Sequence, residues 1–514
     1  MADNLGSFKV FSQGGLNLNR DVLSQGELQP GSAISLLNYE PAVTGGYRKV
    51  SGFTNDYGTL PGTGNVLGVA VANGINDGIL GARKPSSGSN YLHYWNNSTS
   101  AWVAVTTSGS PTMTGVSKVR FTRYNFSTPK VLLTDGINPA ATYDGTTYTQ
   151  ITHANAPTDP KFAAAFANHM FLAGDPAEDY NLYFSIPDDE TNYDPNLGAG
   201  VIPVGFPIIS IKVFRDSLFV FGVNNIKRLV GNNKSNFALE HVTDDLGCLA
   251  SDSVVEIGGD LLFLSQDGIR PISATNKIGD VQLESLSKDI QSLFTDVVLE
   301  QDLDALSSVL VRSKSQFRLF YDVTNANGLL GGLRKDLQGN MGFEFGQLLG
   351  IEASCVDSGY IGQNEFVIHG DKSGKVHRQE SGNSFGGNNI VSVYQTPFLH
   401  MQDPEQRKII HTVSTYLRSE GTNEIIMSVI FDYDDNTILN PTNFILTNEG
   451  AAAYYNEAVY DNAAAIWSGN PSPVQRVNVS GSGKSVSFRY VTNDTNASHS
   501  VQGIVVTFGV GDRL

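Results

Sequence analysis

The chain has 514 residues, of which 40% are hydrophobic and 17% are charged, and its formal net charge is −17. The charged share lies below the roughly 25% of ordinary soluble domains, so Gly, Ser, Thr and Asn must supply much of the polar surface. This acidic balance argues against a protein that grips nucleic acid through a basic surface. With only two cysteines, Cys248 and Cys355, the sequence excludes a disulfide scaffold and a cysteine-rich metal cluster.

The N-terminal sequence has no basic start followed by an apolar core, so we expect no signal peptide. No apolar run approaches the roughly 20 residues that a membrane-spanning helix needs. We therefore expect a chain without a membrane span that is made in a reducing cytoplasm.

Residues 1–60 combine short apolar pieces with many turn residues, and we expect them to form an extended arm that docks on a partner surface. Residues 38–53 of this arm read NYEPAVTGGYRKVSGF. The stretch is too broken for a helix and too polar for a buried strand. Two interpretations are open at this point: contact with phosphate or nucleic acid, or an exposed arm that docks on a neighbour.

Residues 61–380 alternate short apolar runs with polar turns. Trp95 and Trp102 flank a polar Asn-Asn-Ser-Thr-Ser turn, which is typical of a hairpin. Sets of three or four such strands recur every roughly 40 to 50 residues, as in a β-propeller. We therefore predict an all-β fold with a propeller of about six blades. The alternatives are a β-sandwich or a string of small hairpin-rich domains.

Residues 287–300 are the one stretch with a helical pattern. Its apolar residues share one helical face, and Ser287 is the expected N-cap. We expect this short helix to lie between two blades with its apolar face in the core. The residues of that face are Ile290, Leu293, Phe294, Val297 and Val298.

The chain changes character after a Gly- and Ser-rich stretch at residues 381–388, which we interpret as a linker. The strands predicted in residues 386–514 are longer. Val486, Phe488 and Tyr490 alternate with polar residues, so one face of that strand is expected in a core. These residues predict an antiparallel β-sandwich that forms a platform together with residues 1–60.

No motif for catalysis or for binding a cofactor or metal survives comparison with its structural alternative. His369 and His377 are expected to approach across a hairpin with Asp371 nearby, but we favour two surface imidazoles over a metal site. Residues 186–195 are acidic but lack the glycine of a calcium loop, so we interpret them as a solvated loop. Residues 118–126 interleave basic and aromatic residues, which an amphipathic strand explains better than nucleic-acid binding. We predict that the chain is not an enzyme.

Several phrases in a fixed order carry a family resemblance. They begin with the arm sequence quoted above and continue with DSLFVFGVNNIKRLVG, GDLLFLSQDGIRPIS, SLSKDIQSLF, YQTPFLHMQDPEQRK and VQGIVVTFGVGDR. Together they resemble the tail nozzle, or tail tubular, proteins of short-tailed bacteriophages. The resemblance spans nearly the whole chain, and it rests on the order of these phrases because no single one is a specific signature.

This resemblance implies a structural protein of the virion tail that forms a homo-hexameric ring below the portal and adaptor rings. Genomic DNA would pass through the lumen of the ring without sequence-specific binding, and a tail fibre or spike and a tip needle or plug are further expected partners. It implies no covalent chemistry and no cofactor. An acidic lumen would let DNA pass without adhering, since phosphates bind to cations through counterion release.

Within such a ring, the docking interpretation of residues 38–53 becomes the better one. Tyr47 and Phe53 would anchor the arm, and Arg48 and Lys49 would pair with carboxylates of the adaptor or of the next subunit. A second group of expected interface residues lies in the late phrase YQTPFLHMQDPEQRK: Asp403, Arg407 and Lys408.

The alternative function is a propeller that binds or cleaves carbohydrate during recognition of a host receptor. It predicts a monomer or trimer with a central pocket lined by aromatic residues and paired carboxylates. Trp95 and Trp102 would then stack on sugar, although cross-strand packing explains them equally well. An intracellular scaffold propeller is a third reading, which the lack of a strict sequence repeat disfavours.

Overall fold

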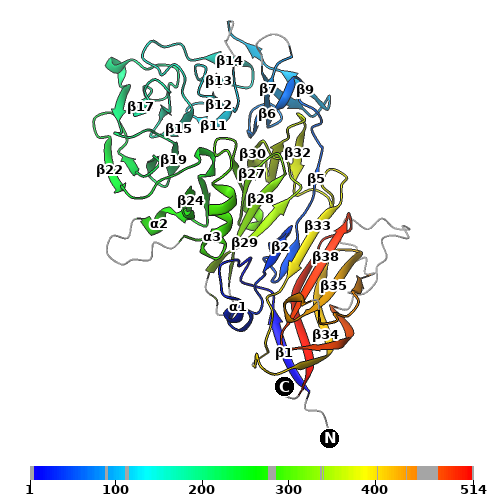
Figure 1. Cartoon of the computed structure of the whole chain (residues 1–514). Coiled ribbons are helices and arrows are strands. Elements are labelled where there is room, and N and C mark those ends of the chain that lie inside the picture. Colours follow the sequence, from blue (N-terminus) through cyan, green and yellow to red (C-terminus); the bar gives the residue numbers. More distant parts are fainter. Residues whose placement is uncertain are drawn as a thin grey trace.

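Short apolar runs separated by turn residues become strands that pair with their neighbours in sequence throughout the first three quarters of the chain. The structure is a computed structural model that describes residues 5–86, 91–109, 115–275, 285–335, 339, 341–401, 403–435, 437–448 and 473–511 (Figure 1). The fold is all-β, as the sequence predicts. No helix of the described residues is long and apolar enough to cross a membrane.

Within the described residues, seven groups of mainly antiparallel strands, which we call blades 1 to 7, follow one another along the chain. Blade 1 holds β6 (Thr63–Val71), β7 (Ile79–Lys84), β8 (Leu92–Asn96) and β9 (Ala101–Ala104). Blade 2 holds β11 (Arg120–Asn125), β12 (Pro129–Thr134), β13 (Ala141–Tyr143) and β14 (Thr147–Gln150), with β10 (Thr106–Thr107) beside β14. Blade 3 holds β15 (Phe162–Phe166), β16 (His169–Ala173), β17 (Asn181–Phe184) and β18 (Gly200–Pro203). Blade 4 holds β19 (Ser210–Phe214), β20 (Ser217–Phe221), β21 (Ile226–Val230) and β22 (Ala238–Thr243); blade 5 holds β23 (Val255–Ile257), β24 (Asp260–Ser265) and β25 (Gly268–Pro271); blade 6 holds β26 (Ser307–Val311), β27 (Gln316–Asp322), β28 (Asn327–Lys335) and β29 (Met341–Leu349); blade 7 holds β30 (Cys355–Ile361), β31 (Asn364–Gly370) and β32 (Val376–Gln379), completed by β5 (Phe53–Thr54).

The first strand of each blade faces the centre of a ring. Strand β6 packs against β11 and β30, β15 against β11 and β19, and β26 against β23 and β30. Between blades 4 and 5, the Ser210 hydroxyl donates to the carbonyl of Ser251 at 3.1 Å. The ring is therefore a β-propeller. The sequence suggested about six blades because residues 306–379, which form blades 6 and 7, look like one long set.

Blade 7 is closed by a strand from the far N-terminal part of the chain. Strand β5 pairs antiparallel with β32, with Phe53 opposite Gln379. The Phe53 ring contacts the rings of His369, His377 and Phe385 at centroid distances of 4.9, 4.8 and 5.4 Å. Because residues 50–54 hold the last blade, the propeller ring is completed only when this part of the predicted arm docks.

Residues 390–511 form the predicted antiparallel sandwich together with strands from the N-terminal region. One sheet holds β1 (Gly6–Phe11), β3 (Tyr39–Pro41), β4 (Tyr47–Lys49), β34 (Lys408–Ser419), β37 (Val474–Gly483) and β39 (His499–Val510), and the other continues from blade 6 through β2 (Ser35–Leu37), β33 (Ile390–Gln395), β38 (Val486–Asp494), β35 (Asn423–Phe431) and β36 (Phe444–Asn448). The second sheet has nine strands in all and runs from the propeller into the sandwich (Figure 1).

The sandwich core follows the predicted alternation with one exception. Val486, Phe488 and Tyr490 are buried and Arg489 is exposed, as expected. Ser487 is buried too, although we expected it to face water, because its hydroxyl donates to the carbonyl of Thr396 at 2.8 Å.

The helical pattern at residues 287–300 forms three short consecutive turns. These are the 3-10 turn η3 (Lys288–Ile290), the α-helical α3 (Gln291–Leu293) and the π-helical η4 (Phe294–Val298). Ile290, Leu293, Phe294 and Val298 are buried as expected, whereas the side chain of Val297 lies outside the described ones. Ser287 does not cap the helix, because its hydroxyl accepts a hydrogen bond from the amide of Ile269 at 2.9 Å.

The remaining helical segments are short. They are α1 (Val22–Leu28), α2 (Ile272–Thr275), η1 (Pro195–Leu197), η2 (Ser251–Ser253), η5 (Arg312–Lys314) and η6 (Asp432–Asp434). Asp21 caps α1 by accepting from the amide of Ser24 at 2.8 Å. This helix was not expected from the sequence, since Gly26 interrupts its pattern; the glycine is required because a Cβ would lie 2.0 Å from the carbonyl oxygen of Phe398.

We expect Phe53→Ala to lower the free energy of unfolding by about 3 kcal/mol, because it empties a buried aromatic site at the closure of the ring. Urea unfolding followed by fluorescence measures this loss. Leu439→Ala is the control, since its side chain is 92% exposed, and should change little. A loss below about 1 kcal/mol for Phe53→Ala would contradict a role of β5 in holding blade 7.

Candidate functional site

Residues 35–54, which we call the strap, join the propeller to the sandwich. Strand β2 pairs antiparallel with β33 and parallel with β29. The hairpin of β3 and β4 then pairs with β39, and β5 closes blade 7. The amide side chain of Asn38 donates to the carbonyls of Leu349 and Val391 at 2.9 and 2.8 Å, one in each part.

A buried cluster of charged side chains fastens the strap. Glu40, which is 2% exposed, accepts hydrogen bonds from Arg48 at 2.9 Å and from Lys314 at 2.6 Å. Arg318, which is 1% exposed, lies 3.5 Å from Glu40 and is also bound to Glu380. Burial alone would raise the pKa of Glu380, but Arg318 and Lys314 hold it well below its usual range.

The same cluster reaches the sandwich. Arg48 donates from Nε and from a terminal nitrogen to the two oxygens of Glu420, each at 2.6 Å. Burial raises the pKa of Glu420, but the hydrogen bond from Arg48 and the nearby positive charges together outweigh it, and the pKa is lowered. We call the six residues the strap ion cluster: Glu40, Arg48, Lys314, Arg318, Glu380 and Glu420.

The structure corrects the prediction of an exposed arm at residues 38–53. Tyr47, Lys49 and Phe53 are buried in their own chain, and the Lys49 ammonium lies 2.6 Å from Asp494. Arg48 is 19% exposed and is paired as described above. A charged or aromatic side chain that is already satisfied within the chain is a poor anchor for a partner. Contact of these four residues with an adaptor or a neighbouring subunit therefore has no support in their surroundings.

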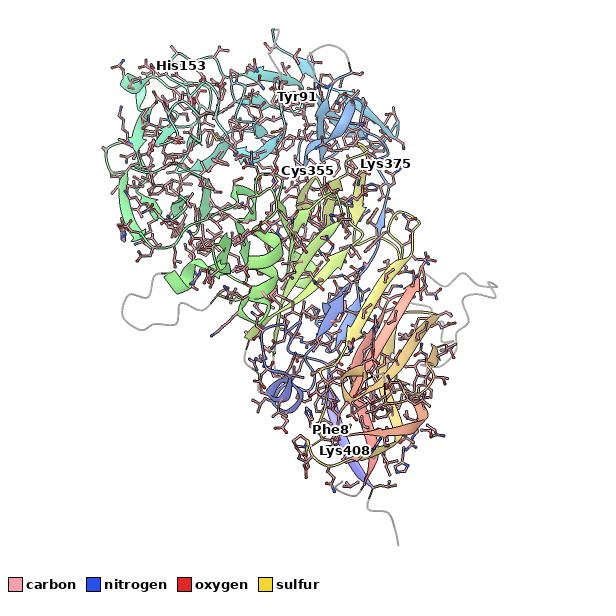
Figure 2. The ribbon with its side chains drawn as sticks, viewed as in Figure 1. Phe8, Tyr91, His153, Cys355, Lys375 and Lys408 are labelled. Carbon is pink, nitrogen blue, oxygen red and sulfur yellow. The ribbon has the colours of Figure 1, made fainter. Side chains whose placement is uncertain are left out.

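The second predicted interface group lies at the end of the sandwich away from the propeller, where Figure 2 labels Lys408. Lys408 is buried and donates to the carbonyls of Asp403 and Lys484. Asp403 accepts from the amide of Glu405 at 2.9 Å. Arg407 is exposed, with a hydrogen bond to the Ser482 hydroxyl at 3.0 Å. An interface here stays a prediction, and Arg407 is its one exposed member.

The propeller encloses a central channel of about 330 Å³ that is lined by the first strands of all seven blades. Figure 2 places Cys355, one of the lining residues, at the inner edge of blade 7. Lys118 and Arg123 are five residues apart along β11 and its approach, about 16 Å of extended chain. The channel therefore has a Lys118 end and an Arg123 end.

Ion pairs and hydrogen bonds cross the channel at its Lys118 end. Asp252, which precedes β23, lies 2.7 Å from the Lys118 ammonium and 2.8 Å from the Arg120 guanidinium. Burial would raise the pKa of Asp252, but these two cations outweigh it and lower the pKa. Lys118 also donates to the carbonyl of Leu306 at 2.6 Å. The side chains of blade 2 thus tie blades 5 and 6 together.

The Arg123 end holds three cations. Arg123 donates to the carbonyl of Val71 at 2.5 Å and lies 3.3 Å from Asp357. Arg312 donates to the Ser358 hydroxyl at 2.8 Å. Lys212 projects from β19 and is exposed to water within the channel. The sequence of residues 118–126 indicates only an amphipathic strand. The cations that join it in the channel come from strands far apart in sequence, so no local pattern reveals them.

His369 and His377 lie directly opposite each other on β31 and β32, as predicted. Their rings are stacked with centroids 4.8 Å apart, and His377 Nε2 lies 3.1 Å from Asp371. They are not surface imidazoles, since both are buried. Burial, followed by the neighbouring His377, lowers the pKa of His369 well below its ordinary value. No group of three His, Cys, Asp or Glu residues in the described ranges could hold a metal ion.

Two other predicted features have local explanations. Glu190 of the acidic loop at residues 186–195 is buried and accepts a hydrogen bond from the Lys130 ammonium at 2.8 Å. Only part of this loop is therefore solvated.

Trp95 and Trp102 form the predicted cross-strand pair with ring centroids 5.5 Å apart. The Trp102 indole donates to the carbonyl of Tyr57 at 2.7 Å, which fixes the ring against the chain.

No protein-family model matches the chain, and no curated protein matches it. Similar solved structures include the extracellular domain of the BT4673 hybrid two-component system from B. thetaiotaomicron, with 13% identity, 66% of this chain and 42% of that chain covered, and a TM-score of 0.41. Another is an exo-β-1,3-galactanase from Phanerochaete chrysosporium, with 10% identity, 89% of this chain and 100% of that chain covered, and a TM-score of 0.25. The chain spans less than half the length of the BT4673 domain. At such low identity and TM-score, neither likeness bears on what this chain does.

We expect Glu40→Gln to destabilise the chain by about 3 kcal/mol, because it leaves the buried Arg318 and Lys314 with one carboxylate fewer. Chemical unfolding measures the loss. Glu352→Gln is the matched control, because its ion pair with Lys372 is 40% and 49% exposed on its two sides and should contribute little. Equal stabilities of the two variants would contradict the importance of the strap ion cluster.

We expect acid to destabilise the contact between the strap and the sandwich, because the unfolded chain can protonate His499 more easily than the folded chain can. Burial, with the nearby charges of Lys49 and Arg48, lowers the pKa of His499 from 6.5 to about 3. The unfolded chain therefore binds more protons below pH 6.5, and stability falls as the pH drops from there toward 3. Between pH 7 and pH 5 we expect His499 to account for a loss of about 2 kcal/mol.

Unfolding curves of His499→Gln across this pH range test that assignment. The variant should lose less stability on acidification than the unaltered chain does. His411→Gln, which removes an exposed imidazole, is the control and should keep the original pH slope. If His499→Gln keeps that slope as well, His499 is not the acid-sensitive group.

Proposed function

We propose that this protein is a structural subunit of the tail nozzle of a short-tailed bacteriophage, where six copies form a ring around a duct for the ejected genome. The observation that supports this proposal most is the fastening of the propeller to the sandwich. A nine-stranded sheet and the strap ion cluster connect them, so the two parts should move as one body. A duct wall must keep its shape while DNA passes, which a hinged pair of domains would not do.

The duct of this proposal lies between subunits, not inside one propeller. The channel of about 330 Å³ has room for only about ten water molecules. The ion pairs of Asp252 with Lys118 and Arg120 also cross its Lys118 end. A DNA duplex does not fit such a space. The blades would instead form part of the wall around the ring's lumen.

The remaining parts of the proposal rest on the resemblance of the sequence. The sandwich and strap would form the platform next to the portal and adaptor, and fibres, spikes or a needle would attach elsewhere on the tail. The net charge of −17 suits a duct that repels phosphate groups, and we expect a net negative lumen. The protein would be made in the host cytoplasm and would act in the virion tail.

The carbohydrate alternative has less support. Trp95 and Trp102 pack on each other and on Tyr57, so their faces serve the hairpin. The lowered pKa of Asp252 is the opposite of what a general acid for glycoside cleavage needs. Asp357, the other channel carboxylate with a close partner, is paired with Arg123.

We expect the purified chain at micromolar concentration to form a species of six times its 55.3 kDa mass, or, after addition of the adaptor ring of the same virus, a species heavier than the adaptor ring by that amount. Mass photometry measures the mass, and negative-stain images of the same sample show whether the species is a sixfold ring. Arg407→Glu should shift the population toward monomers, because Arg407 is the exposed cation of the predicted interface. A chain that stays monomeric with and without the adaptor would contradict the proposal.

A further inference from the structure

The propeller channel has a charge opposite to that of the chain. Overall, 51 acidic residues outnumber 34 basic ones. The channel wall reverses this balance, with five cations against three carboxylates. The cations are Lys118, Arg120, Arg123, Lys212 and Arg312, and the carboxylates are Asp252, Glu256 and Asp357.

The Arg123 end is where, among the described residues, a cation of the channel wall is left without an ion pair. Lys118 and Arg120 are neutralised in part by Asp252 at the other end. Arg123 shares Asp357 with the amide of Val71, which donates to that carboxylate at 2.8 Å. Arg312 lies 3.7 Å from Glu365. Lys212 has no hydrogen bond or ion pair to its ammonium within the described part of the chain.

The three cations of this end lie near one another although they come from blades 2, 4 and 6. Arg123 and Arg312 both donate to Ser358, one to its carbonyl at 3.3 Å and the other to its hydroxyl at 2.8 Å. The channel wall removes part of the hydration of Lys212 and so lowers its pKa, although the side chain still reaches water. The charges of Arg123 and Arg312 lower the pKa further and those of Asp357 and Glu256 oppose this, so all of these groups share one electrostatic environment. Like charges held together in a partly enclosed space repel unless an anion joins them.

We propose that Arg123, Lys212 and Arg312 form a binding site for a phosphate group at this end of the propeller channel. Guanidinium groups present several N–H donors to a tetrahedral oxyanion, and a lysine ammonium adds a mobile point charge. The channel of about 330 Å³ holds a phosphate with several waters, or the phosphate end of a small monoester. The site is independent of the nozzle proposal, since it lies within a single propeller.

Glu256 opposes phosphate binding in the channel, and this gives a second test of the site. It lines the same channel, and its charge acts on Lys212 in the direction that keeps the ammonium protonated. Its carboxylate is exposed and would repel a phosphate. Removing its charge should therefore strengthen binding, whereas removing the charge of Lys212 should weaken it.

Isothermal titration of the full chain with inorganic phosphate at low ionic strength tests the site. We expect saturable binding to one site per chain, weakened at least tenfold in Lys212→Met and strengthened in Glu256→Gln. Lys9→Met removes an exposed lysine of β1 and should bind like the unaltered chain. Lys212→Met relieves repulsion, so its urea midpoint should be equal to or higher than that of the unaltered chain.

Two results would overturn the proposal. One is the absence of saturable phosphate binding by the unaltered chain. The other is equal affinity of the unaltered chain and Lys212→Met, which would mean that phosphate binds elsewhere as an adventitious ion only. A titration with a small phosphate monoester then separates the two sources of the group: a tighter fit than free phosphate favours the monoester, and equal or weaker binding favours the free ion.

Discussion

The buried ion pairs around Glu40 and Arg318 are the constraint on which the rest of this structure depends. Glu40 is 2% exposed and Arg318 is 1% exposed, so both charged groups lose almost all of their hydration and each needs a full set of partners. Those partners come from the strap, from blade 6 and from the end of blade 7, and Arg48 of the strap is paired in turn with Glu420 of the sandwich. Because a missing partner leaves an uncompensated buried charge, these four regions are stable only when they assemble together.

This constraint decides how the propeller closes. Phe53 and β5 complete blade 7, and the residues just before them are held by Glu420 and Asp494 in the sandwich. The Lys49–Asp494 pair joins positions 445 residues apart in sequence. Contacts of such long range form late in folding because the chain must first lose much conformational entropy. The ring and the sandwich should therefore finish folding in one step, and a separate propeller of residues 61–380 would lack its closing strand.

Features that depend on contacts between neighbouring residues could be predicted from the sequence, whereas features that depend on distant residues could not. The hairpin of Trp95 and Trp102 and the turn at Arg215 and Asp216 depend on neighbouring residues, and both formed where expected. The alternating burial of Val486, Phe488 and Tyr490 is also local information. By contrast, Arg48 and Lys49 looked available because Glu420 and Asp494, the sandwich carboxylates that pair with them, lie hundreds of residues away. A single sequence shows that a charge needs a partner, but not where the partner is.

The channel cations follow the same rule as the strap cations, with one difference. In the strap ion cluster, each cation of the described chain has a carboxylate within ion-pair distance. At the Lys118 end of the channel, one carboxylate serves two cations. At the Arg123 end, Lys212 stays without a partner in the described residues, although Glu256 and Asp357 are near enough to act on its charge. An unpaired cation is cheap at an open surface, where water solvates it, but not in an enclosed wall. The ion pair that each cation of the strap ion cluster has is thus missing for Lys212, and a small multivalent anion is the species whose charge and size would supply it.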